Sequence, residues 1–229
     1  MPISRNLTLI VHFMLDHILP PFMRDSRLVM SPLFYILFRE KAAYYLDFKE
    51  KLHGLSDQQI NEYYELLSDT FIQRETDLNR ACIEFLEQQV LGAEVLDVAC
   101  GKGYLSERMA EQGFSVTGVD IITPSATTDN PKYLEAEITK LPFPDKHFDT
   151  VVCTHTLEHI RDIEKAIAEI ERVCKKRLII VVPCQREYRY TFDLHIHFFP
   201  YEHKLREVLG PKGNIDKLGG DFFYVRDML

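Results

Sequence analysis

The chain reads Val95-Leu96-Asp97-Val98-Ala99-Cys100-Gly101-Lys102-Gly103-Tyr104-Leu105-Ser106, and then Val116-Thr117-Gly118-Val119-Asp120. This pattern predicts an apolar strand, a glycine turn, a helix and a second strand that ends on a carboxylate. Glycine has no Cβ, so a ligand can approach the turn closely, and the amide groups that open the helix favour negative charge. Asp120, 19 residues after Gly101, can accept hydrogen bonds from both hydroxyls of a ribose. The stretch therefore predicts a nucleoside site.

Composition narrows the class of protein. The 229 residues suffice for one large domain, or a core domain with an appendage. A formal charge of -8 argues against a broad nucleic-acid surface, so a small-molecule substrate is expected. The five cysteines include no C-x-x-C pair, which is typical of reduced thiols in the cytoplasm. No signal peptide and no membrane-spanning stretch are expected.

From residue 93 onward, short apolar strands alternate with helices, which predicts a mostly parallel sheet covered on both faces. The predicted strands are Glu94–Val98, Ser115–Asp120, Lys132–Ala136, Phe148–Thr154 and Arg177–Val182. The predicted helices are Tyr104–Gln112, Asp162–Cys174 and Tyr201–Leu209. A hairpin over Asn214–Arg226 would complete the edge of the sheet. The expected domains are a helical cap over 1–75 and a nucleoside-binding domain over 76–229.

The cap is predicted from apolar residues at helical spacing. Helices are expected over roughly 7–18 and 41–51, with an apolar, aromatic segment at 28–38 between them. Further helices are expected over a segment that begins with a capping box at Ser56–Gln59 and over about 76–89. We expect these helices to form a lid or a dimer surface. Their apolar faces, including Phe34–Phe38, could also cover a hydrophobic acceptor or rest on a membrane surface.

The residues around the turn narrow the class of nucleoside ligand. Dinucleotide dehydrogenases have G-x-G-x-x-G, whereas Ser106 occupies the third glycine position here. Asp97 lies at the end of the first strand, just before the turn. A carboxylate there would repel a pyrophosphate but could pair with the amino group of an amino acid. The residues disfavour a nicotinamide dinucleotide without excluding it.

Three motifs in order resemble a known family over about Ala93–Val182. Leu96–Gly103 is similar to the first motif of class I S-adenosylmethionine-dependent methyltransferases, in the small-molecule type 11 group. Leu134–Asp149 contains an acid, a Leu-Pro-Phe turn and a Phe-Asp strand start, like that group's second signature. Thr156–Ile160 is similar to the third. The resemblance implies a doubly wound, seven-stranded α/β sheet, with S-adenosylmethionine as cofactor.

The resemblance also implies roles for individual residues. The methionine part would be held by Asp97 and the backbone from Ala99 through Gly101 to Gly103. Asp120 would take the ribose hydroxyls. The adenine would meet Ile121, Glu137 and Ile138, and the stretch around Thr154 would lie under the sulfonium. Ala99 stands where the family often has glycine, and alanine is tolerable there if the residue keeps a negative φ.

Histidines are the candidate bases. His155 and His195 are predicted to deprotonate the acceptor where this is needed, whereas His159 is expected to pack or cap its loop. His195 and His197 would share a face of an extended segment, which leaves a two-ligand metal arrangement open, although no metal is expected. The loop that contains them is rich in aromatic residues, including Tyr188, Tyr190 and Phe192, and we expect it to border the acceptor.

The expected function is methyl transfer from S-adenosylmethionine to O, N or C of a small-molecule or lipid-linked acceptor. The alternative is a non-catalytic nucleoside-binding partner that scaffolds or regulates another enzyme. A nucleic-acid methyltransferase is disfavoured by the charge and by the lack of an Asn-Pro-Pro-Tyr type motif after the fourth strand. Homodimerisation through the N-terminal helices and a peripheral membrane contact also remain open.

Overall fold

A computed structural model describes residues 13–68, 75–125 and 128–228. Contacts divide the chain into two units. Unit 1 contains the described residues up to 68 together with Gln185–Ile196, and unit 2 contains those from 75 to 184 and from 197 onward. The segment Gln185–Ile196 therefore groups with the helical unit, whereas the sequence expectation counted it with the sheet.

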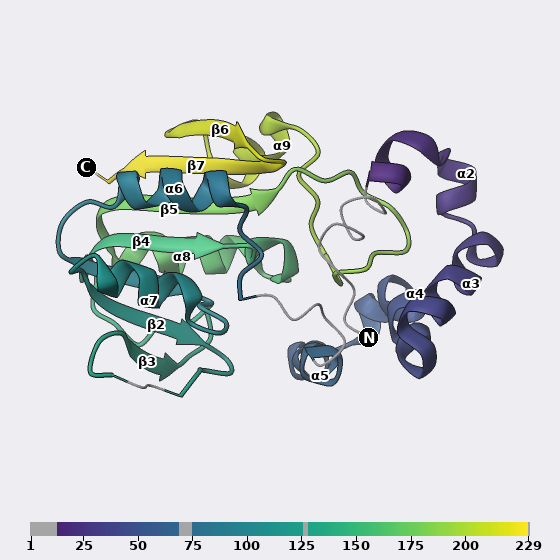
Figure 1. Ribbon diagram of the computed structural model, residues 1–229, viewed down its shortest axis with the longest axis horizontal. Coiled ribbons are helices and arrows are strands. Elements are labelled where there is room, and N and C mark those ends of the chain that lie inside the picture. The colour runs from purple at the N-terminus through teal and green to yellow at the C-terminus, as the bar shows by residue number, and fades with distance from the viewer. Residues whose placement is uncertain (1–12, 69–74, 126–127, 229) are drawn as a thin grey trace. The chain divides into compact units, whose positions relative to one another are not determined.

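Unit 2 is built on the predicted seven-stranded sheet, in the order β3-β2-β1-β4-β5-β7-β6 (Figure 1). The strands are β1 (Glu94–Val98), β2 (Ser115–Asp120), β3 (Lys132–Glu135), β4 (Phe148–Thr154), β5 (Cys174–Pro183), β6 (Asn214–Leu218) and β7 (Asp221–Asp227). Strands β1 to β5 pair in parallel, and β7 runs antiparallel to both β5 and β6. The expected α/β class and the C-terminal hairpin are confirmed.

Helices cover both faces of this sheet, as Figure 1 shows for α6 and α7 in front and α8 behind. The helices are α6 (Arg80–Gln89), α7 (Tyr104–Glu111), α8 (Ile163–Val173) and α9 (Glu202–Leu209). Alternate residues of a strand point to opposite faces, so Val95 packs with α6 and α7 whereas Leu96 packs with α8 and α9. The central strands are consequently apolar on both sides, and polar residues collect at their ends.

Strand register brings the predicted site residues to one edge of the sheet. Val98 of β1 pairs with Val119 of β2 on one side and with Cys153 of β4 on the other. These three positions lie at the carboxyl ends of parallel strands. The residues that follow them therefore lie close together, and they include Asp120 and the turn at 99–103. Ligands of open α/β sheets bind at this edge, where the strand order reverses.

Unit 1 is helical. Its helices are α2 (Pro21–Arg24), α3 (Arg27–Phe38), α4 (Ala42–Lys51) and α5 (Asp57–Ser68), with short turns η1 (Met14–Ile18), η2 (Arg39–Lys41) and η3 (Leu52–Gly54). The capping box is confirmed, because Ser56 N donates to Gln59 Oε1 at 2.8 Å and Gln59 N donates to Ser56 Oγ at 3.2 Å. The first part of the helix expected over 7–18 lies outside the described residues.

The aromatic loop after β5 contributes to the core of unit 1. Tyr188, Tyr190 and Phe192 are buried there, and the Phe192 ring stacks on Phe34 with centroids 4.7 Å apart. Lys49 Nζ donates to the Tyr188 carbonyl at 2.7 Å. These three side chains therefore pack with the helices of unit 1, and the expectation that their loop borders the acceptor stays a prediction.

Candidate functional site

The turn that follows β1 has an unusual backbone. Ala99, Gly101 and Gly103 have φ values of +56°, +55° and +83°. The condition of a negative φ at Ala99 is therefore not met, because the chain reverses here and Cys100 N donates to Val119 O at 3.0 Å. A positive φ is low in energy only for a residue without a Cβ. Ala99 is therefore held in a backbone conformation that costs about 1–2 kcal/mol of conformational free energy. Backbone strain of this kind is common where a chain must present its amide groups to a ligand.

The two glycines of this turn have different surroundings. A Cβ added at Gly101 would meet nothing within 4 Å, so the backbone faces open space and a ligand can approach it. A Cβ added at Gly103 would collide with the Tyr133 ring, whose hydroxyl donates to the Gly103 carbonyl at 3.4 Å. The Gly101 position is thus suited to ligand contact, and the Gly103 position to packing.

Asp97 is the buried acid of the site, with 2% of its surface exposed. The Ser106 hydroxyl donates to Asp97 Oδ2 at 2.6 Å. Burial raises the pKa of Asp97 to about 7; the Ser106 hydrogen bond opposes this rise and the nearby Asp120 charge adds to it. A cation that paired with Asp97 would relieve the cost of burying its charge, as the amino group of an amino acid would.

Asp120 lies on the other side of the turn, at the end of β2. Its Oδ2 accepts from Gly101 N at 2.8 Å and its Oδ1 accepts from Ile122 N at 3.1 Å. Each carboxylate oxygen has two lone pairs, so both can still accept a hydroxyl hydrogen. Asp120 therefore shapes the glycine turn while it remains able to bind a diol.

The remaining positions that the resemblance implies lie around the same edge. Ile121 is half-buried directly after Asp120, and Ile138 packs against the sheet core. Glu137 is exposed, and its carbonyl accepts from Lys140 N at 3.0 Å. Thr154 is half-buried at the end of β4. The fold brings these side chains to one edge, and their contact with adenine or sulfonium stays a prediction.

His155 follows β4 and lies between two carboxylates. Its Nδ1 is 3.5 Å from Glu158 Oε1 and its Nε2 is 3.4 Å from Asp221 Oδ2. Burial lowers the pKa of His155, but the two carboxylates outweigh burial and raise it to about 10. An imidazolium holds its proton at neutral pH, so this arrangement fits a general-base role for His155 poorly. Sequence reasoning missed both partners, since Asp221 reaches the site only through the β6–β7 hairpin.

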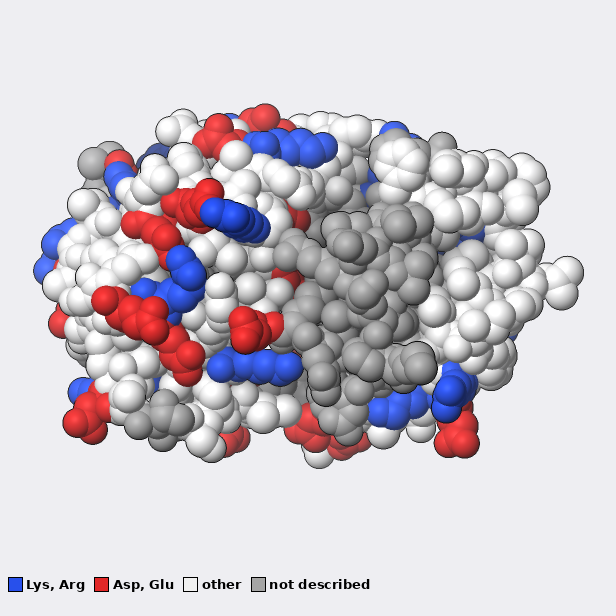
Figure 2. All heavy atoms as spheres, viewed as in Figure 1, with Lys and Arg blue, Asp and Glu red and all other residues white. Residues whose placement is uncertain are grey.

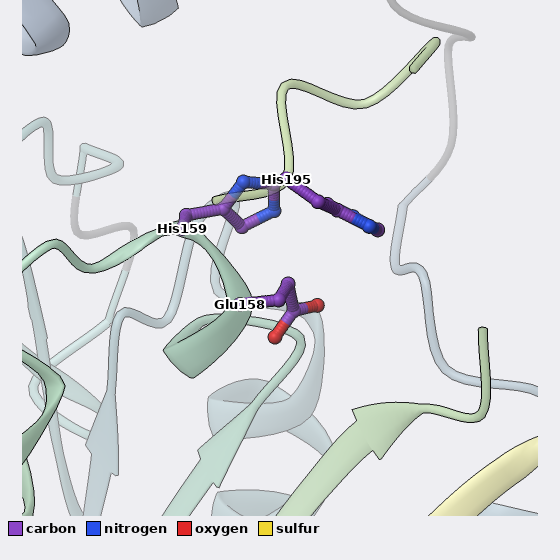
Figure 3. Close-up of side chains that lie close together, drawn as sticks. All are labelled: Glu158, His159 and His195. Atoms are coloured by element: carbon purple, nitrogen blue, oxygen red, sulfur yellow. The ribbon is translucent and has the colours of Figure 1, made fainter. Parts of the chain in front are cut away.

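The other histidines have contacts of their own. Figure 3 shows Glu158 and His159 extending to the same side of the short 3₁₀ helix η4 (Leu157–His159), and a ring nitrogen of His159 lies within 4.8 Å of a Glu158 oxygen. His197 Nε2 lies 2.9 Å from the Ile160 carbonyl. His195, also labelled in Figure 3, belongs to unit 1, where its Nδ1 is 2.7 Å from Gln185 Oε1.

Comparisons with known proteins identify this site's family. Residues 96–182 match the family model described as a methyltransferase domain. The stretch is a class I methyltransferase domain, of the type that uses S-adenosylmethionine. The ubiquinone biosynthesis O-methyltransferase of Pseudomonas fluorescens (strain Pf0-1) is 33% identical over 131 residues, which cover 49% of this chain and 56% of that protein. The chain spans about half the length of the relatives it matches.

Solved structures share the fold of this methyltransferase domain. A protein of Pyrococcus horikoshii OT3 superposes with a TM-score of 0.57 at 18% identity, over 73% of this chain and 99% of that one. The [4+2]-cyclase SpnF superposes with a TM-score of 0.55 at 18% identity, over 71% of this chain and 75% of that one. At such sequence identities the comparison shows a shared fold only. The reaction of this chain has to be inferred from the residues of its site.

The residues of the domain fit this cofactor. Buried Asp97 suits an ammonium group, Asp120 suits a ribose diol, and the backbone at Gly101 faces open space. The edge is also rich in carboxylates, which would repel the pyrophosphate of a dinucleotide. The site therefore fits the dinucleotide of a nicotinamide dehydrogenase poorly.

Proposed function

We propose that this chain transfers a methyl group from S-adenosylmethionine to an oxygen, nitrogen or carbon atom of a small-molecule or lipid-linked acceptor. The observation that carries the proposal is the pair Asp97 and Asp120 at adjacent strand ends, on either side of an open glycine turn. The similarity to the Pseudomonas O-methyltransferase of ubiquinone biosynthesis favours an oxygen acceptor.

The sulfonium supplies a methyl carbon that is already activated for displacement. In the transfer the S–CH₃ bond breaks, its electron pair stays on sulfur, and the acceptor atom forms the new bond to carbon. The protein then contributes alignment and exclusion of water, with a base only where the acceptor must lose a proton. Asp97 and Asp120 would fix both ends of the cofactor, so that the methyl group faces the acceptor.

We propose His195 rather than His155 for the base role. Gln185 Nε2 donates to Tyr188 OH, so its Oε1 is the atom that faces His195 Nδ1 at 2.7 Å. An Nδ1–H that donates to this oxygen places the imidazole lone pair on Nε2, which is the tautomer that a base requires. Free cysteine thiols, three of them buried, support a reducing cytoplasm as the place where the enzyme works.

The proposed function is tested by calorimetry with S-adenosylhomocysteine, followed by an assay for its release in the presence of candidate acceptors. We expect binding in the micromolar range or tighter, at about -8 kcal/mol, and turnover with at least one acceptor. Binding without turnover on any acceptor would favour the non-catalytic scaffold. An absence of binding would reject both.

A lipid surface is the second partner that we propose, through the outer face of α3. Leu28, Tyr35 and Ile36 are 86%, 53% and 76% exposed, although α3 also buries its opposite face in unit 1. Figure 2 shows few charged side chains over α2 and α3. Exposed apolar residues on one face of a helix are typical of helices that lie on bilayers. Within the described residues, no helix is long and apolar enough to cross a membrane.

The lipid contact predicts a loss of vesicle binding in the double variant Leu28→Ser/Ile36→Ser. Each side chain would contribute about 1.5–3 kcal/mol when buried in lipid, so partitioning onto vesicles with phosphatidylglycerol should fall at least about tenfold. Leu134→Ser on β3, where the side chain is 43% exposed, is the matched control and should leave partitioning unchanged. Equal binding in all three proteins would reject the proposal. A change from dimer to monomer in light scattering would favour homodimerisation instead.

A further inference from the structure

His155, Glu158 and Asp221, here called the His155 cluster, carry unbalanced negative charge. One imidazole lies between two carboxylates, at 3.5 Å and 3.4 Å, so even a protonated His155 can balance only one of the two negative charges when both acids are ionised. Asn79 Nδ2 donates to Asp221 Oδ2 at 2.7 Å but brings no charge. An uncompensated charge away from water is costly, so the His155 cluster is suited to a cation that arrives with a ligand.

Glu158 is the carboxylate of the His155 cluster with unused hydrogen-bonding capacity, and Nε2 of His155 likewise has no hydrogen-bond partner among the described residues. Glu158 is fully buried, and neither carboxylate oxygen accepts a hydrogen bond within the part of the chain that the structure describes. Most buried polar groups in proteins have a hydrogen-bond partner, so such an exception calls for an explanation. Since Asp221 is already bonded to Asn79, the unmet requirement lies at Glu158.

The His155 cluster lies on the methionine side of the cofactor site. Strand β4 flanks β1 on the side opposite β2, so the His155 cluster and Asp120 lie on opposite sides of the glycine turn. Burial raises the pKa of the buried Cys153 thiol, and the charges of Glu158 and Asp97 both add to the rise. Both carboxylates therefore act on one atom at the end of β4, and Asp97 is the acid assigned to the methionine ammonium group.

On the basis of the proposed function, we infer that the His155 cluster is the counter-charge of the sulfonium and makes the chain bind S-adenosylmethionine in preference to S-adenosylhomocysteine. The two molecules share the ammonium group and the ribose, and differ by the methyl group and its positive charge. A unit charge acts over several ångströms in a weakly screened site. The His155 cluster would thereby help the neutral product to be replaced by fresh cofactor after each transfer.

The test is calorimetry of both molecules with wild type, Glu158→Gln and Asp221→Asn at about pH 8, where a histidine of ordinary pKa is uncharged. We expect Glu158→Gln to lower the affinity for S-adenosylmethionine at least about tenfold relative to the affinity for S-adenosylhomocysteine. Asp221→Asn should shift the ratio of the two affinities in the same direction, and it serves as the second variant should Glu158→Gln fail to fold.

Asp149→Asn is the matched control, because Asp149 lies near the opposite end of β4, pairs with Lys176 at 2.9 Å and carries the same formal charge. It should leave the affinity ratio as in wild type. An unchanged ratio in the two cluster variants, with both molecules still bound, would overturn the inference. Failure of wild type to bind S-adenosylhomocysteine would instead refute the proposed function.

Discussion

Asp97→Asn is expected to abolish cofactor binding and at the same time to stabilise the fold at neutral pH. The variant removes the charge that would pair with the methionine ammonium group, and loss of a buried charged partner of this kind costs at least about 3 kcal/mol, or more than a hundredfold in affinity. Calorimetry with S-adenosylhomocysteine measures this loss. Affinity within about threefold of wild type would remove Asp97 from the site.

The stability gain follows from the pKa of Asp97, which burial raises to about 7. The folded protein binds this proton more tightly than the unfolded chain, whose aspartate titrates near 3.9. The contribution to the free energy of unfolding is therefore fully present below about pH 4 and is lost as the pH rises to about 7. Asparagine carries no charge, so at pH 8 Asp97→Asn should unfold with a free energy higher by on the order of 2–4 kcal/mol.

Cofactor affinity should show the opposite pH dependence. Pairing with an ammonium group requires the ionised carboxylate, so wild-type affinity should fall by up to about tenfold per pH unit below 7. Glu94→Gln, at the amino end of the same strand, is the control, because this exposed acid bonds only to Ser115 Oγ at 2.9 Å among the contacts of the described residues. It should change neither the affinity nor its pH dependence. A flat wild-type profile between pH 5.5 and pH 8 would contradict the raised pKa.

Asp120→Ala is expected to produce the second large effect, since it removes two functions at once. The ribose would lose two charge-assisted hydrogen bonds, each contributing about 1.5–3 kcal/mol, and the turn would lose its bonds from Gly101 N and Ile122 N. We expect S-adenosylhomocysteine affinity to fall at least about a hundredfold in calorimetry. Unfolding should require about 1–3 kcal/mol less, because two backbone amides lose their acceptor.

Glu135→Ala separates this effect from a general loss of negative charge. Glu135 is exposed at the end of β3, directly paired in register with Asp120, and has no role assigned by the resemblance. Its removal should leave affinity within about twofold of wild type, as is usual for a surface side chain. An equal loss of affinity in Asp120→Ala and Glu135→Ala would mean that the acidic residues at this edge act only through their combined negative charge.

Several elements of the candidate site could be predicted from local sequence. Glycine spacing, the acid at the end of each strand and the apolar runs specify a strand, a turn and a helix through short-range sterics and burial. The Ser56–Gln59 capping box and the Asn214–Arg226 hairpin were predicted for the same reason, since each depends on neighbours a few residues away. The positive φ of Ala99 could not be predicted in this way, because it depends on the Cys100 bond to Val119, which belongs to another strand.

The sequence by itself determined the α/β class and the order of its motifs, because periodicity and turn chemistry are local properties, and its resemblance to class I methyltransferases indicated the cofactor. Only the tertiary structure decided that Asp221 meets His155, 66 residues earlier in the chain, and that Phe192 stacks on Phe34 in the helical unit. Such contacts depend on which strands become neighbours and which faces are buried. The ionisation of the site was likewise decided by the tertiary structure. Burial raises the pKa of Asp97, and the two carboxylates that folding brings to His155 raise the pKa of its imidazole.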